Sequence, residues 1–157
     1  MDKKFSNLPL RKGIGVALLN KNNQIFVAKR IDNPNDFWQM PQGGIDKGEN
    51  PLKAAYRELN EETSIKTVEL IREIKDEITY YLPDNLLGII WKGKYKGQTQ
   101  KWYIMRFLGE DNEINLKTKN PEFLEWKWVN HKNITDKVVE FKLHVYEKIK
   151  NELNKLI

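Results

Sequence analysis

The sequence predicts an α/β fold in which strands lie on both sides of a central helix and a second helix closes the chain. Residues 14–19, 24–30 and 99–107 are rich in β-branched and other apolar side chains, which is typical of strands. Residues 51–63, and the stretch from about residue 138 onward, place apolar side chains at helical spacing. This order of strands and helices favours layers of helix and sheet around a common core.

The composition favours one compact domain, residues 1–157. A chain of 157 residues, 39% hydrophobic and 11% aromatic, can bury one core but is too short for two large ones. The chain contains no cysteine, so neither a disulfide framework nor a thiolate site is possible. No run approaches the ~20 apolar residues of a membrane span, and the N-terminus lacks an apolar signal core. We therefore expect a cytoplasmic protein without a membrane partner.

The formal net charge is +5. This excess of lysine and arginine can attract a polyanion. Scattered lysines serve solubility equally often, so the charge alone does not decide between the two interpretations.

The first part of the chain predicts a hairpin followed by a loop. Residues 14–19 and 24–30 are the two strands, and the polar residues 20–23 form their turn. Residues 31–37 are a loop by composition, and residues 38–40 are predicted as a short strand.

The central helix is predicted from its cap and from its apolar spacing. Asn50 is a good N-cap, and Pro51 suits the first helical position. The predicted buried face consists of Leu52, Ala55, Tyr56, Leu59 and Thr63.

Strands and a terminal helix follow the central helix. The further strands are predicted at residues 67–74, 78–81, 99–107 and 126–129. Residues 82–85 and 93–97 are turns, and residues 111–120 form a polar loop. At least one of Tyr80 and Tyr81 is expected in the core or in cross-strand packing. The terminal helix begins at about residue 138, and its buried face consists of Val138, Phe141, Val145, Ile149 and Leu153.

Three carboxylates crowd the end of the central helix. At about 100° per residue, Glu58, Glu61 and Glu62 fall within about 100° of arc. They repel one another and face the negative end of the helix dipole, and each effect costs a few tenths of a kcal/mol. Clustered hard oxygen ligands bind Mg²⁺ or Mn²⁺, which offsets the repulsion. A solvated acidic face is the alternative.

The same stretch resembles the Nudix pattern G-x5-E-x7-R-E-U-x-E-E-x-G-U, in which U is aliphatic. The matching residues are Gly43, Glu49, Arg57, Glu58, Leu59, Glu61, Glu62 and Ile65. Ser64 departs from the pattern, which has glycine there to close the helix in a left-handed conformation. We expect strain of about 1 kcal/mol at Ser64 and retained activity, because this position carries no ligand.

The resemblance covers nearly the whole chain and extends to the bacterial RNA pyrophosphohydrolase branch, also described as dinucleoside polyphosphate hydrolases. It rests on RKGIGVALLN, WQMPQGGID, YKGQTQKW, PEFLEWKWV and VVEFK. The resemblance implies a Nudix-type α/β/α sandwich with mixed sheets, a catalytic loop and helix, a C-terminal helix, and Mg²⁺ or Mn²⁺ as cofactor.

It also implies roles around the metal. Arg57 would orient carboxylates, Glu49 would align the loop or help hold metal, and a carbonyl of the glycine loop, assigned to Gly44, would join the metal ligands. Glu122, in the PEF context, would be a fourth carboxylate in metal binding and catalysis, although from its composition alone this stretch is ordinary surface.

Four further residues are candidates for substrate binding. Arg11 and Arg30 match arginines associated with the 5′ end of the substrate, and each could equally be an ordinary surface cation. Lys101 is either a phosphate partner or a solvated cation. Phe141 stacks on the first nucleobase in the family, or it anchors the terminal helix to the sheet. His131 and His144 have no local partners that suggest a ligand pair.

The expected function is removal of pyrophosphate from the 5′-triphosphate end of RNA, which leaves a 5′-monophosphate and initiates mRNA decay. The first alternative is asymmetric hydrolysis of dinucleoside polyphosphates such as diadenosine tetraphosphate. An alternative of a different class is a non-catalytic binder of RNA 5′ ends or nucleotides. No DNA partner is expected, and the oligomeric state stays open.

Overall fold

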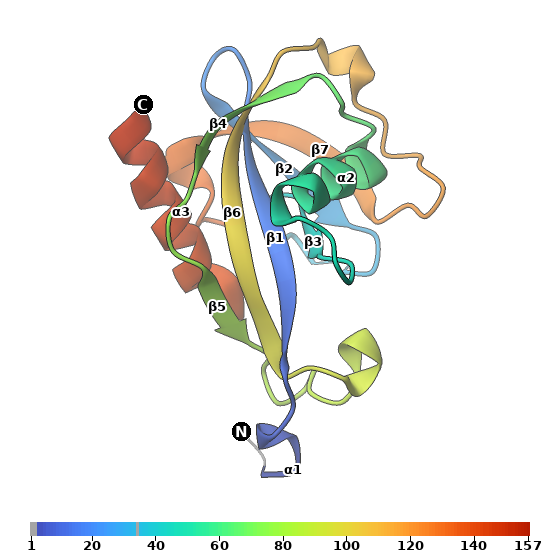
Figure 1. Ribbon diagram of the computed structural model, residues 1–157. Coiled ribbons are helices and arrows are strands. Elements are labelled where there is room, and N and C mark those ends of the chain that lie inside the picture. The colour runs from blue at the N-terminus through green and yellow to red at the C-terminus, as the bar shows by residue number, and fades with distance from the viewer. Residues whose placement is uncertain (1–2, 34) are drawn as a thin grey trace.

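The computed structural model describes residues 3–33 and 35–157, and its strands form one mixed sheet (Figure 1). The strands are β1 (Leu10–Leu19), β2 (Gln24–Arg30), β3 (Gln42–Gly44), β4 (Val68–Glu73), β5 (Ile78–Tyr81), β6 (Gly97–Phe107) and β7 (Phe123–Asn130). The helices are α1 (Lys3–Ser6), α2 (Pro51–Thr63) and α3 (Leu143–Leu156). The sheet has the order β4-β6-β1-β2-β7, with β3 paired to β1 and β5 paired to β6. Only the β1–β6 pair is parallel among these pairs of described strands.

Helices cover both faces of this sheet, α2 on one side and α3 on the other (Figure 1). Alternate residues of β1 explain the arrangement, since neighbouring side chains of a strand point to opposite faces. Val16 packs in the core that contains Leu59 of α2, whereas Ala17 packs in the core that contains Ile149 and Leu153 of α3. The predicted α/β sandwich is therefore confirmed, and residues 14–19 of β1 are an apolar run because both faces of the strand are covered there.

Both ends of α2 lie where the sequence predicts. The side chain of Asn50 accepts hydrogen bonds from the backbone N–H groups of Leu52 and Lys53. Ser64 closes the helix in the left-handed conformation, with φ of 69°, and its backbone N–H donates to the carbonyl of Asn60. The helix thus ends as expected in spite of the serine.

The buried face of α2 differs from the prediction. Ala54 and Glu62 are buried, whereas Tyr56, predicted in this face, is 37% exposed. Ala54 and Ala55 lie side by side against the sheet, and their small side chains let the helix approach it closely. The buried face of α2 is thus rotated about the helix axis relative to the predicted face. Tyr56 therefore points toward solvent, and Glu62 points into the protein.

The prediction of a strand at residues 38–40 is wrong. Only Gln39 forms an isolated bridge, with Ala28. The pairing strand is β3, whose glycines lie opposite Gly13 and Ile14 of β1. Glycine has a low strand propensity, so the sequence pattern favours a loop where the structure has backbone pairing.

The start of the terminal helix is also later than predicted. A short 3₁₀ turn, Glu140–Lys142, precedes α3, which begins at Leu143. Phe141 therefore lies before the helix, although it still packs against the same core as Val145.

The remaining elements agree closely with expectation. Tyr80 is buried and its hydroxyl donates to Gln98, whereas Tyr81 is exposed. His131 contacts Asn154 and His144 contacts the carbonyl of Thr79, so both histidines tie α3 to the rest of the molecule. Within the described ranges, no helix has both the length and the apolar character needed to cross a bilayer.

Candidate active site

Arg57 connects the glycine loop to the acidic end of α2. Its guanidinium donates to both carboxylate oxygens of Glu49, at 2.8 and 2.9 Å, and to the carbonyl of Gly44 at 2.9 Å. It also donates to Glu58 at 2.9 Å and to Glu61 at 3.1 Å. A planar guanidinium suits such paired contacts, and here it fixes three carboxylates and one carbonyl together.

The charges of this network stabilise one another. The hydrogen bonds from Arg57, together with the backbone N–H of Asp46, lower the pKa of Glu49 to about 2. The same hydrogen bond to Glu49 raises the pKa of Arg57 above its ordinary value. Glu49 thus has the contact with Arg57 that loop alignment, one of its two predicted roles, requires.

The two glycines of β3 are required for close approach. A Cβ atom on Gly43 would clash with the carboxylate of Glu58, and one on Gly44 would clash with the guanidinium of Arg11. The loop backbone thus lies directly against two candidate functional side chains.

The three glutamates of α2 lie in different environments. The Glu58 side chain is largely covered, and burial raises its pKa while Arg57 opposes that shift. Glu61 is the exposed member of the set and binds Arg57. Glu62 is only 2% exposed, and neither of its carboxylate oxygens has a hydrogen-bond partner among the described residues. Burial, and then repulsion from Glu122 and Glu58, raises the pKa of Glu62 well above its ordinary value.

Glu122 reaches this group from the start of β7. The β2–β7 register shifts between Lys29 and Arg30, and the backbone N–H of Ile31 donates to the carbonyl of Glu122 at 2.9 Å. This irregularity brings the loop before β7 beside α2. The structure therefore brings Glu122 beside Glu58 and Glu62 of α2, although it lies far from them in the sequence.

The donor chemistry of this group fits a divalent cation. A buried carboxylate without a partner is costly unless it holds a proton or a cation, and carboxylate and carbonyl oxygens are the ligands that Mg²⁺ and Mn²⁺ prefer. As the side chains stand, no three acidic or histidine residues in the described ranges form a ready-made cation site. Arg57 occupies oxygens of Glu58 and Glu61, so a cation would have to share or displace those contacts.

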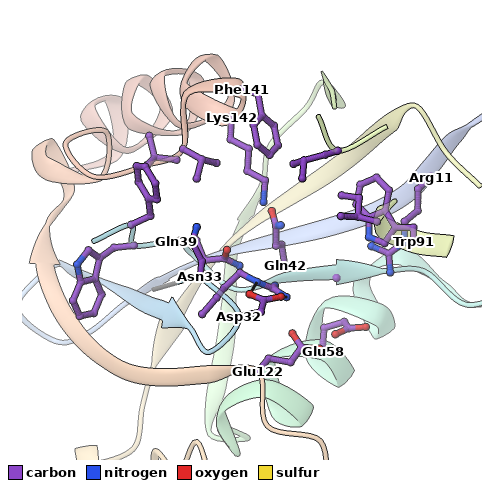
Figure 2. Close-up of a pocket in the computed structure, with 18 residues that line it drawn as sticks. Arg11, Asp32, Asn33, Gln39, Gln42, Glu58, Trp91, Glu122, Phe141 and Lys142 are labelled. Atoms are coloured by element: carbon purple, nitrogen blue, oxygen red, sulfur yellow. Dashed lines mark hydrogen bonds and ion pairs between the residues drawn. The ribbon is translucent and has the colours of Figure 1, made fainter. Parts of the chain in front are cut away.

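A cavity of about 650 Å³, here called the main cavity, opens beside these carboxylates (Figure 2). Glu58 and Glu122 lie on one side of it, and Phe141 and Lys142 lie on the opposite side. Arg11 lies at a third side. The cavity thus combines an acidic wall with cationic and aromatic walls.

Lys142 is a functional candidate that the sequence reasoning missed. It is 8% exposed, and its ammonium lies 5.3 Å from the ring centroid of Tyr80 and 5.8 Å from that of Phe141. Burial, and then the nearby charge of Arg30, lowers its pKa to about 7. The available signal was its position directly after Phe141 in the VVEFK segment.

The two arginines of the main cavity are held differently. Arg30 donates twice to Asp32, at 2.8 and 2.9 Å. Arg11 makes no hydrogen bond or ion pair through its guanidinium with the part of the chain that is described, and it lies 5.1 Å from the ring centroid of Trp91. Trp91, also missed from the sequence, has φ of 51° in a 3₁₀ turn, and such left-handed backbone costs about 1–2 kcal/mol outside glycine.

Lys101 is not brought to this cavity. Its ammonium lies 2.7 Å from the carboxylate of Glu73, and it does not line the main cavity. Phe141 does line it, and also packs against Tyr80 with ring centroids 5.7 Å apart. Phe141 therefore satisfies the geometric requirement of both of its predicted roles.

The fold and the glutamate-bearing loop and helix together define a family. The chain belongs to the NUDIX domain family, whose model matches residues 9–149. The RNA pyrophosphohydrolase of Pelagibacter ubique is 68% identical over 151 residues, which cover 96% of each chain. The RNA pyrophosphohydrolase of Rhodospirillum rubrum is 46% identical, over 94% of this chain and 89% of its own. The suspected family is thus confirmed.

Solved structures agree with the fold. The dihydroneopterin triphosphate pyrophosphohydrolase of E. coli superposes with a TM-score of 0.71 at 20% identity, over 92% of this chain and 99% of its own. An Ap4A hydrolase of C. elegans, in a binary complex, superposes with a TM-score of 0.66 at 19% identity, over 93% and 99%. At these identities the likeness concerns the arrangement of helices and strands.

Proposed function

We propose that this protein is a Nudix pyrophosphohydrolase that removes pyrophosphate from the 5′-triphosphate end of RNA and leaves a 5′-monophosphate. The observation that carries the proposal is the main cavity, in which Arg11, Arg30 and Lys142 face the carboxylates Glu58 and Glu122. Cationic side chains suit the phosphate chain, and the carboxylates suit the divalent cations that neutralise it. The 68% identity to a protein named RNA pyrophosphohydrolase supports the same substrate.

We assign the metal to Glu58, Glu61, Glu62 and Glu122, with the Gly44 carbonyl as a further ligand, and we expect Mg²⁺ or Mn²⁺. When bound, the cation neutralises phosphate oxygens and lowers the pKa of water. Arg57 keeps Glu58 and Glu61 oriented, and one of Glu58, Glu61 and Glu122 accepts the proton of the attacking water. Arg57 donates hydrogen bonds to Glu58 and Glu61 but not to Glu122.

The remaining residues bind the substrate in this proposal. Arg11 and Arg30 contact the phosphates near the 5′ end, with Arg30 exchanging its bond to Asp32 for a phosphate oxygen. Phe141 stacks on a nucleobase, a contact worth about 1–3 kcal/mol. Lys101 has no place in it, because it does not line the main cavity.

The test is release of pyrophosphate from triphosphorylated RNA by the purified protein with Mg²⁺. We expect Glu61→Gln and Glu62→Gln to lose rate by about two or more orders of magnitude while staying folded, because each removes a proposed metal ligand. Circular dichroism checks the fold, and the exposed Glu69→Gln on β4 is a matched control. Unchanged turnover in both ligand variants would contradict the metal assignment.

The same purified protein can distinguish the proposed function from two alternatives. A dinucleoside polyphosphate also presents a base followed by phosphates, so the main cavity suits it too. Competition between triphosphorylated RNA and diadenosine tetraphosphate gives the ratio of the two specificity constants, which we expect to favour RNA. A non-catalytic binder would hold RNA equally well with chelator and would yield no product.

A further inference from the structure

A second cavity, of about 780 Å³, shares Glu122 with the main cavity. Glu61 and Glu62 also line it, so the proposed metal ligands face both cavities. Glu58 lines only the main cavity of the two. Glu122 is thus the residue at which the two cavities adjoin.

Two residues with unpaired buried polar atoms line this second cavity. Among the described residues, buried side-chain atoms without a hydrogen-bond partner include both carboxylate oxygens of Glu62 and the hydroxyl oxygen of Thr118. Both residues line the second cavity. Buried polar atoms in folded proteins are nearly always paired with protein, water or a bound group, so these atoms point to an occupant.

The second cavity is lined by charged residues of both signs. Glu61, Glu62 and Glu122 are acidic, whereas Lys66 and Lys119 are basic and form no ion pair with the described residues. The carboxylate of Glu113 accepts the backbone N–H of Lys66 at 2.8 Å. A free anion would be repelled by the three glutamates. A polyphosphate bound to a divalent cation suits both kinds of side chain. Its cation would contact the glutamates, and its oxygens would contact the lysines.

We propose that the second cavity binds the outer two phosphates of the substrate and then the pyrophosphate product as its metal complex. This inference rests on the proposed function. In the reaction, water supplies the new phosphorus–oxygen bond and the anhydride link between the first and second phosphates breaks. One proton of the water is released, and the pyrophosphate remains beside Lys66 and Lys119.

Product inhibition tests the proposal. With turnover of triphosphorylated RNA at fixed free Mg²⁺, we expect inorganic pyrophosphate to inhibit the unaltered protein. Lys66→Ala and Lys119→Ala should each weaken this inhibition about threefold to tenfold, since each removes one charge-assisted contact at an exposed site. Lys66→Arg should keep most of it. Lys117→Ala is the matched control, because Lys117 is exposed in the same loop and does not line the cavity.

Calorimetric titration of pyrophosphate into the unaltered protein in Mg²⁺ buffer measures the same site without turnover. The three alanine variants should rank as in the inhibition assay, and orthophosphate should bind more weakly than pyrophosphate. The proposal is overturned if Lys66→Ala and Lys119→Ala bind pyrophosphate as the Lys117→Ala control does. In that case RNA hydrolysis by the unaltered protein would still support the proposed function, whereas absent hydrolysis with intact pyrophosphate binding would contradict the proposed function alone.

Discussion

At the scale of single residues, burial makes the charged form of Glu62 costly. It is a buried carboxylate whose oxygens have no hydrogen-bond partner among the described residues, and its neighbours Glu122 and Glu58 are also acidic. On α2 it belongs to the buried face, together with Ala54 and Ala55, and not to the solvent-exposed face. A buried carboxylate without a partner in a cavity wall is best explained by binding.

We therefore predict that Glu62→Gln stabilises the metal-free protein while abolishing turnover. The folded pKa of Glu62 lies above its ordinary value of 4.5, so its folded state favours the proton, and the wild type loses stability as pH rises through the raised pKa. Glutamine carries no charge to bury, and we expect a gain of about 1–3 kcal/mol in the free energy of unfolding at about pH 7. Urea denaturation with chelator measures it. A less stable variant would show that the carboxylate has a partner in solution.

From the lowered pKa of Lys142, we predict that substrate binding depends on pH. Its pKa of about 7 means that the free protein loses this charge as pH rises past neutrality, whereas a bound phosphate favours the charged form. We expect KM for triphosphorylated RNA to rise between about pH 6.5 and 8.5. Lys142→Arg should flatten this rise, because a guanidinium keeps its charge in that range. An identical rise in the arginine variant would assign the pH dependence to another group.

At the scale of elements, the predictable parts of the site lie where local chemistry sets the structure. Asn50 and Ser64 mark the ends of α2 through capping, which acts within a few residues. The start of α3 has no side-chain cap, so the apolar spacing of Val138 and Phe141 wrongly extends that helix. The strand β3 is built of glycines that pair with β1, and this pairing depends on contacts distant in sequence.

The conformation of the turn that carries Trp91 also could not be predicted from the sequence. Its residues Trp91 and Lys92 adopt left-handed backbone, which their own residue types disfavour, and the ring centroids of Trp91 and Tyr95 lie 6.1 Å apart. Sequence reasoning placed only a turn near Gly93. The stacking of Trp91 on Arg11 is consequently visible only in the folded molecule.

We predict that Trp91 positions Arg11 for phosphate binding. Trp91→Ala should lower kcat/KM for triphosphorylated RNA about threefold to thirtyfold, the range of a partly desolvated cation–π contact, and Trp91→Phe should recover part of it. In an Arg11→Ala background, Trp91→Ala should have little further effect, because its partner is already absent. Ile89→Ala is the control, since Ile89 is 68% exposed in the same turn region and does not line the main cavity. Additive losses would mean that Trp91 acts independently of Arg11.

At the scale of the whole molecule, the sheet divides the roles of its two faces. The α2 face supplies the glutamates and Arg57, whereas the α3 face supplies Phe141 and Lys142 at its edge. The main cavity lies where residues of both faces meet. The family resemblance anticipated this gathering for Glu58, Glu122, Arg11, Arg30 and Phe141, but Lys101 does not line the cavity and pairs with Glu73 instead.

Because the site draws on both faces, we propose that residues 1–157 fold as one cooperative domain. Leu59 and Leu153 are fully buried on opposite faces of the sheet. Leu59→Ala and Leu153→Ala should each lower the free energy of unfolding by about 2–5 kcal/mol, and their effects should add within about 0.5 kcal/mol because the two side chains belong to separate clusters. Urea denaturation followed by tryptophan fluorescence and by circular dichroism should give one coincident transition in each variant. If Leu153→Ala instead produced a first transition that left the α2 face folded, the two faces would be separate folding units, and the cavity between them would be a contact of independent parts.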